Sequence, residues 1–350
     1  MLPNPAEAQS LPASSFPPAA GVPQSSVRRD PWVDCLKAIA IIGVVYIHAG
    51  APLGGLFRFG VPVFLGFWAF YTERALMRLP AGGQRRYLTR RFLAFLIPYL
   101  FWTGLYLAIF FRADGEQSHG WRFFSGWFGG YGWAGQYYFL LLFQLIVLMP
   151  GFRRLVTPKS ILPLLAVSML LDFLLGLLFS QTHMMSVLGY RLSVFWLPYL
   201  FIGVALARGM LPPLPMPALG LLAMMLLLMP LEQKHLVFDT IYLAGTGEIA
   251  SLLLLWWVLG GRRGATPKPD NAAPTVIERT VAWIGRNTFP IFVLNPMALA
   301  LLHRIAAVPA WLLRHPVVGP LVLVPVAILV CLALGEILKR LRLGVLVGDL

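Results

Sequence analysis

The chain has 350 residues, of which 58% are hydrophobic and only 12% are charged, and its mean hydropathy is +0.75. This composition indicates an integral membrane protein and excludes an ordinary soluble domain. The net charge of +14 comes from Lys and Arg residues that are scattered between apolar runs. Because these residues do not gather on one soluble face, nucleic-acid binding is not expected.

At the amino end, residues 1–29 are rich in Pro, Ala and Ser and contain no apolar core. We predict that they form a disordered cytoplasmic tail, since they also lack the apolar region of a cleaved signal peptide. Residues 30–343 are predicted to form one membrane domain.

Ten apolar runs of about bilayer-spanning length follow the tail. They cover residues 32–53, 57–79, 88–111, 136–151, 160–180, 190–209, 214–231, 238–260, 281–303 and 316–338. Their even spacing without alternating polar residues favours helices over a barrel, so the predicted fold is an all-α bundle of about ten transmembrane helices. With this count, most of the 28 Lys and Arg residues fall on the side of both chain ends, which predicts that both termini are cytoplasmic.

The first apolar run contains two ionisable residues, Lys37 and His48. Eleven helical steps of about 100° place them on the same helix face, with roughly 16 Å of depth between them. Such groups inside a bilayer are most often functional. The structural alternative is that His48 bonds a neighbouring helix.

A basic cluster stands where the third run begins, formed by Arg85, Arg86, Arg90 and Arg91. Guanidinium groups bind phosphates well, so the cluster could hold a phosphorylated substrate. Retention of basic residues on the cytoplasmic side produces such a run as well, and both explanations stay open.

Acidic residues occur inside three other runs. Asp172 lies near the middle of the fifth run and Glu248 near the middle of the eighth. An unpaired carboxylate there would be costly, so each is expected to be paired or protonated, and either could line a cavity. Glu73 and Arg74, at the inner end of the second run, are expected to form an interfacial ion pair.

The predicted outer loop at residues 112–135 mixes carboxylates with Trp and Tyr. These side chains could bind a sugar, although an aromatic belt at the membrane surface explains the rings equally well. No metal site is predicted, because the six histidines share no metal-ligand spacing with one another or with the two cysteines.

Six segments, taken in order, carry a family resemblance. They are Asp34–Lys37 together with Val44–Ala49, then Val61–Phe67, Tyr87–Tyr99, Tyr137–Leu140, Trp196–Gly203 and Ile284–Pro296. The ordered set resembles the acyltransferase-3 family of bacterial membrane acyltransferases, in which a basic residue precedes a histidine by eleven positions. The chain departs from that pattern at Lys37, where the family usually has Arg, at Ala94, where it often has a second Arg, and at Asn295, where it frequently has His.

The resemblance implies transfer of an acyl group, most often acetyl, to a sugar hydroxyl of an exported or surface polysaccharide or of its lipid-linked precursor. The donor would be cytoplasmic acyl-CoA, a substrate and not a bound cofactor, and the protein would work in the bacterial inner membrane beside polysaccharide biosynthesis machinery. His48 would act as a general base or as a covalent acyl carrier. The candidates for donor binding are Lys37, Arg86, Arg90 and Arg91, and those for lining the cavity are Asp34, Asp172, Glu248 and Asn295.

Two alternatives remain. One is a transporter or flippase for a lipid-linked glycan, in which Lys37, Asp172 and Glu248 form a path and no covalent step occurs. It predicts inverted halves with matching broken helices, and the two halves of the sequence share no such pattern. The other is a feeder that passes its acyl group to a separate transferase.

Overall fold

The computed structural model describes residues 31–51, 54–110, 124–130, 132–180, 191–235, 246–260, 275–304, 315 and 317–349. The tail predicted for residues 1–29 lies outside them. Every regular element in the described ranges is helical, which confirms the all-α prediction.

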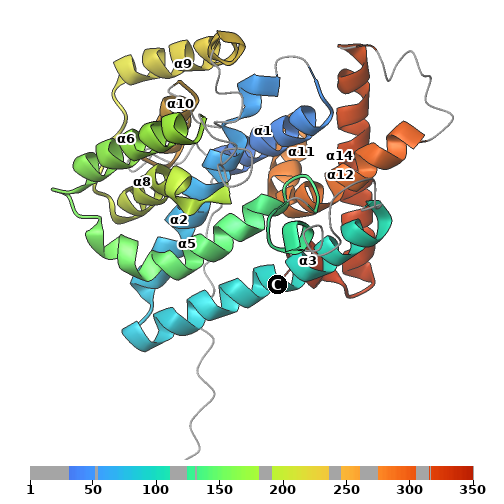
Figure 1. Cartoon of the computed structure of the whole chain (residues 1–350), viewed down its shortest axis with the longest axis horizontal. Helices are drawn as coiled ribbons and strands as arrows, with labels where there is room; N and C mark the ends of the chain where they lie inside the picture. The colour runs from blue at the N-terminus through green and yellow to red at the C-terminus, as the bar shows by residue number, and fades with distance from the viewer. Residues whose placement is uncertain are drawn as a thin grey trace, which may run out of the picture. The chain divides into compact units, whose positions relative to one another are not determined.

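The helices follow one another along the chain as Figure 1 shows. The α-helices are α1 (Pro31–His48), α2 (Gly60–Arg78), α3 (Ala81–Phe110), α5 (Gln136–Leu155), α6 (Ile161–Ser180), α8 (Leu197–Arg208), α9 (Met216–His235), α10 (Thr246–Gly260), α11 (Val276–Arg286), α12 (Thr288–Arg304) and α14 (Val318–Arg340). The short 3-10 helices are η1 (Gly54–Phe57), η3 (Ser193–Trp196) and η4 (Gly344–Val347).

Five of these helices contain a segment long and apolar enough to cross a membrane: α1, α3, α5, α6 and α14. Shorter apolar helical segments cover residues 193–208, 216–226 and 247–260. The chain is therefore a membrane protein by composition and helix length, while the count of ten spans and the cytoplasmic termini stay predictions.

The run predicted as one span at 281–303 is two helices, and that prediction was wrong. The first of them, α11, starts earlier because Thr275 and Glu278 form a capping box: the Thr275 hydroxyl accepts the Glu278 N–H (3.1 Å) and the Glu278 carboxylate accepts the Thr275 N–H (2.8 Å). It ends at Asn287, whose side-chain amide donates to the Trp283 carbonyl oxygen (2.9 Å). The chain then turns into α12.

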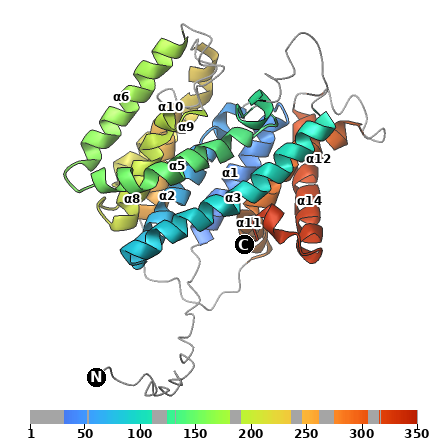
Figure 2. The same cartoon turned by 60° about the horizontal axis from the view of Figure 1, so that its bottom comes forward.

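Helix α1 lies between two hydrophobic clusters. Its first half joins the cluster built mainly by α2, α5, α8 and α10, and its second half joins the cluster built mainly by α3, α12 and α14. Figure 2 shows the same arrangement, with α6, α8, α9 and α10 to one side of α1 and α12 and α14 to the other. Residues at the end of α1 can therefore reach side chains from both clusters.

Close backbone contacts fix α1 and α2 in place. Gly285 of α11 packs directly on the backbone carbonyl of Asp34, and a Cβ at Gly203 of α8 would lie 2.6 Å from the carbonyl oxygen of Gly66 in α2. Glycine at such contacts lets membrane helices approach closely.

The chain beyond the predicted domain end also packs on the bundle. The Trp102 indole N–H of α3 donates to the Leu346 carbonyl oxygen (2.8 Å), and Leu346 and Val347 are buried.

Candidate active site

His48 is the last residue of α1, and its side chain meets Asn295 of α12. The distance from His48 Nδ1 to Asn295 Oδ1 is 2.5 Å. Asn295 is completely buried, so this contact is shielded from solvent. The two residues are far apart in the sequence, and only the packing of α12 on α1 brings them together.

The surroundings of Asn295 determine which nitrogen of His48 carries a proton. The Asn295 amide group donates to the carbonyl oxygens of Ile291 (3.0 Å) and Phe292 (2.8 Å). The Phe292 carbonyl needs this donor, because Pro296, four residues on, has no N–H to offer it. With both amide hydrogens directed to the backbone, Oδ1 can only accept, so His48 Nδ1 donates and Nε2 is left as the basic nitrogen.

A small cavity of about 20 Å³ lies beside the imidazole, with room for roughly one water molecule. His48 and Arg58 line it, together with Gly135 and Tyr137 at the start of α5 and Phe292 of α12. Gly135 has a φ of 95°, and a Cβ there would lie 2.9 Å from the Phe292 ring, so only glycine fits this position. The positive end of the α5 dipole thus faces the same space as two basic side chains.

Arg58 is a site residue that sequence reasoning does not single out. It stands alone in the connection between α1 and α2, with no motif around it. Its only signal in the sequence is its nearness to His48.

Lys37 lies in the first half of α1, eleven residues before His48, and its side chain contacts α2. It is half-buried, and its Nζ is 5.7 Å from the centre of the Phe67 ring and 5.4 Å from that of Tyr71, both on α2. Such contacts stabilise a cation where water is scarce. Lys37 is not among the residues that line the cavity at His48. Asp34, one turn earlier, is buried where α1 meets α11.

The predicted donor-binding arginines lie on the first turns of α3. Arg86, Arg90 and Arg91 are all exposed. The Arg91 guanidinium stacks on the Tyr87 ring at 5.4 Å and donates to its hydroxyl (3.2 Å). These cations are accessible to an anion from solution.

Asp172 and Glu248 form a pair of their own. Both are buried, and their carboxyl groups lie near each other and near Tyr199 of α8. Glu248 lies in the first turn of α10, so the described helix places it nearer an end than the middle. Neither carboxyl group lines the cavity at His48.

The expected ion pair between Glu73 and Arg74 is wrong. Glu73 is completely buried and binds Arg153 of α5 through both carboxylate oxygens (2.7 and 2.9 Å) and Arg208 of α8 (2.8 Å). Arg74 lies about 100° further around α2 and stacks on the Phe70 ring at 5.4 Å. Sequence neighbours on a helix face different directions, and the true partners of Glu73 are distant in the sequence.

Residues 112–123 and residue 131 of the predicted outer loop lie outside the described residues. Trp133, within the predicted range, is buried and stacks on Tyr106 at 5.1 Å, with its indole N–H donating to the Thr103 hydroxyl (3.3 Å). This ring belongs to the protein core.

The fold and the site define a helical membrane protein with one histidine oriented as a base at the end of its central helix. Residues 30–336 match the acyltransferase-3 family, whose description is "Acyltransferase domain". The chain therefore belongs to this family and is a membrane acyltransferase. No curated protein and no solved structure matches it.

Proposed function

We propose that this acyltransferase moves an acyl group, most simply acetyl, from cytoplasmic acyl-CoA to a sugar hydroxyl of an exported polysaccharide or its lipid-linked precursor in the bacterial inner membrane. Family membership supports acyl transfer. The observation that carries the assignment of the chemistry to His48 is its bond to Asn295, which leaves Nε2 as the basic nitrogen.

In the proposed reaction, Nε2 of His48 takes the proton of the sugar hydroxyl while the hydroxyl oxygen attacks the thioester carbonyl carbon of acyl-CoA. The tetrahedral intermediate then collapses and expels the CoA thiolate, which recovers the proton from the imidazolium. A route through an acyl-histidine also uses Nε2, so the orientation by Asn295 serves both routes.

Arg58 takes the role of stabilising the negative oxygen of the intermediate. It shares the cavity with His48, and the amino end of α5, which lines the same cavity, adds a positive dipole. Fixed positive groups of this kind act where charge develops in the transition state.

Donor binding falls to basic residues nearer the inner side of the bundle. Lys37 offers a cation within the membrane domain, and Arg86, Arg90 and Arg91 offer exposed guanidiniums for the CoA phosphates. Asp34 on α1 lies one turn from Lys37 and would line the donor path beside it, while Asn295 on α12 acts through its bond to His48.

The transporter alternative requires Lys37, Asp172 and Glu248 to share one path. The structure instead places Lys37 on the aromatic rings of α2 and pairs the two acids between α6 and α10. These contacts favour the enzyme.

Mass spectrometry of the surface glycan tests the proposed acceptor and donor together. A deletion strain grown on isotope-labelled acetate should lose labelled acyl groups from the glycan, and the wild-type chain should restore them. An unchanged glycan would remove the proposed acceptor class.

A further inference from the structure

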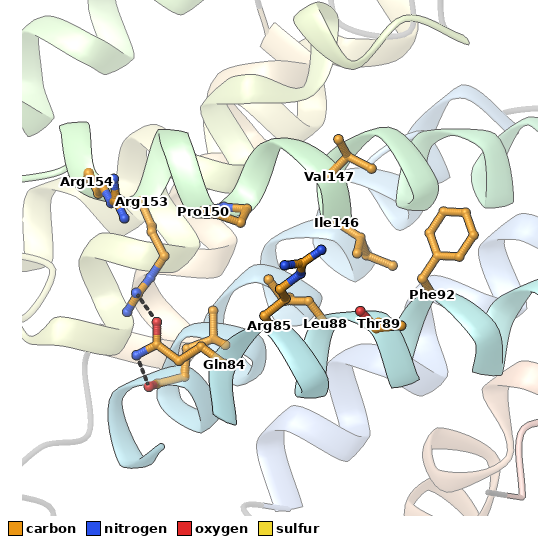
Figure 3. Close-up of a pocket in the computed structure, with 11 residues that line it drawn as sticks. Gln84, Arg85, Leu88, Thr89, Phe92, Ile146, Val147, Pro150, Arg153 and Arg154 are labelled. Atoms are coloured by element: carbon orange, nitrogen blue, oxygen red, sulfur yellow. Dashed lines mark hydrogen bonds between the residues drawn. The ribbon is translucent and has the colours of Figure 1, made fainter. Parts of the chain in front are cut away.

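A groove of about 560 Å³ separates α3 from α5, at the amino end of α3 and the carboxyl end of α5 (Figure 3). The proposed orientation places this groove at the cytoplasmic membrane surface. None of the residues that line the cavity at His48 lines the groove.

The groove has a polar end and an apolar end. Gln84, Arg153 and Arg154 form the polar end, Phe92, Ile146 and Val147 form the apolar end, and Arg85 lies between the two ends. Figure 3 shows the Arg85 side chain extending from α3 toward α5. The Val147 side chain is 69% exposed, so the apolar end opens toward lipid.

The charges at the polar end are not balanced. Arg153 is neutralised by Glu73 and also donates to the Gln84 side-chain oxygen (3.1 Å). Arg85 and Arg154 are exposed, and neither is paired with a carboxylate in the described part of the chain. Two guanidiniums, one at the polar end and one in the middle, therefore line the groove without a compensating acid in the described part of the chain.

The seam between α3 and α5 is closed beyond the groove. Phe143 packs on Phe92 with ring centres 4.7 Å apart and on Tyr99 at 5.4 Å. Tyr137, which lines the cavity at His48, is nine residues before Ile146, the first residue of α5 that lines the groove, a separation of roughly 14 Å along the helix. Packed aromatic rings thus lie between the groove and the cavity at His48 along this seam, which argues against the reacting donor as the occupant.

We propose that the groove binds an anionic phospholipid of the inner leaflet, with the phosphate between Arg85 and Arg154 and an acyl chain along Phe92 and Val147. Basic pockets between membrane helices at the cytoplasmic surface recognise lipid headgroups in this way. The proposal stands apart from the acyl-transfer chemistry and does not depend on it.

Native mass spectrometry of the purified full chain tests the proposal, with added phosphatidylglycerol compared against phosphatidylcholine of the same acyl chains. The double variant Arg85→Gln/Arg154→Gln should bind phosphatidylglycerol about tenfold more weakly than the wild type. Arg279→Gln, an exposed arginine on α11, is the matched control and should bind like the wild type. The charge-preserving pair Arg85→Lys/Arg154→Lys should retain binding.

Three results would overturn the proposal. The first is equal binding of phosphatidylglycerol by the Gln double variant and the wild type. The second is glycerol 3-phosphate binding as tightly as the lipid, which would show that the apolar end contributes nothing. The third is displacement of the lipid by acetyl-CoA, which would make the groove a donor site.

Discussion

At the scale of single residues, the central feature is the fixed orientation of His48. A backbone defect at Pro296 leaves the Phe292 carbonyl without a helical partner, and the Asn295 amide fills that position. The same side chain then holds the imidazole of His48. An irregular turn of α12 thus positions the base.

Asn295→Ala should lower the rate of acyl transfer by about 10- to 100-fold, because the imidazole loses the acceptor that fixes its orientation. Binding of radiolabelled acetyl-CoA should be unchanged, since Asn295 does not touch the donor in this account. The two measurements are made on the same purified preparation. A wild-type rate in this variant would show that Asn295 only supports packing.

Arg58→Gln should reduce the rate by about 100-fold through loss of oxyanion stabilisation, and Arg58→Lys should recover part of it. Steady-state kinetics with acetyl-CoA as the varied substrate give kcat and KM separately, and we expect the loss in kcat. A rise in KM with an unchanged kcat would assign Arg58 to substrate binding instead.

Lys37→Ala should weaken acetyl-CoA binding by about tenfold, while Lys37→Arg should be tolerated, because the proposed need is a positive charge. Equilibrium dialysis with labelled acetyl-CoA measures this directly. His48→Ala is the control and should bind the donor normally. Unaltered binding by Lys37→Ala would remove Lys37 from the donor site.

At the scale of helices, Glu73 ties α2 to α5 and α8 through two arginines. Glu73→Gln should destabilise the fold by about 2 to 4 kcal/mol, because it leaves two largely buried guanidiniums without their shared acid. Thermal unfolding in detergent reports the change. Glu336→Gln, which breaks an exposed pair with Arg340, should change stability by less than about 0.5 kcal/mol. Equal effects of the two variants would contradict the structural role of Glu73.

The order of the helices could be predicted from apolar run lengths, because a bilayer forces long apolar segments to be helical. The start of α11 could also have been predicted from Thr275 and Glu278, whose spacing is that of a capping box. The partners of Glu73 could not have been predicted in this way. A helical pattern shows on which face of its helix a residue lies, but not which distant helix packs against that face.

At the scale of the whole molecule, α1 joins the two hydrophobic clusters and carries His48 at its end. The sequence places Lys37 and His48 on one helix face, and that geometry follows from helical spacing alone. The pairing of His48 with Asn295 and the presence of Arg58 depend on how α12, α5 and the α1–α2 connection pack around that end. Such tertiary packing has no short-range signal in one sequence.

Glycan acylation in deletion cells complemented with His48→Ala, at matched membrane abundance, tests directly whether His48 is the catalytic base. We expect a loss of about 10²- to 10⁴-fold in acylation rate, because the base that takes the hydroxyl proton is gone while the protein stays inserted. Acylation at the wild-type rate with alanine at position 48 would contradict the assignment of His48 as the catalytic residue.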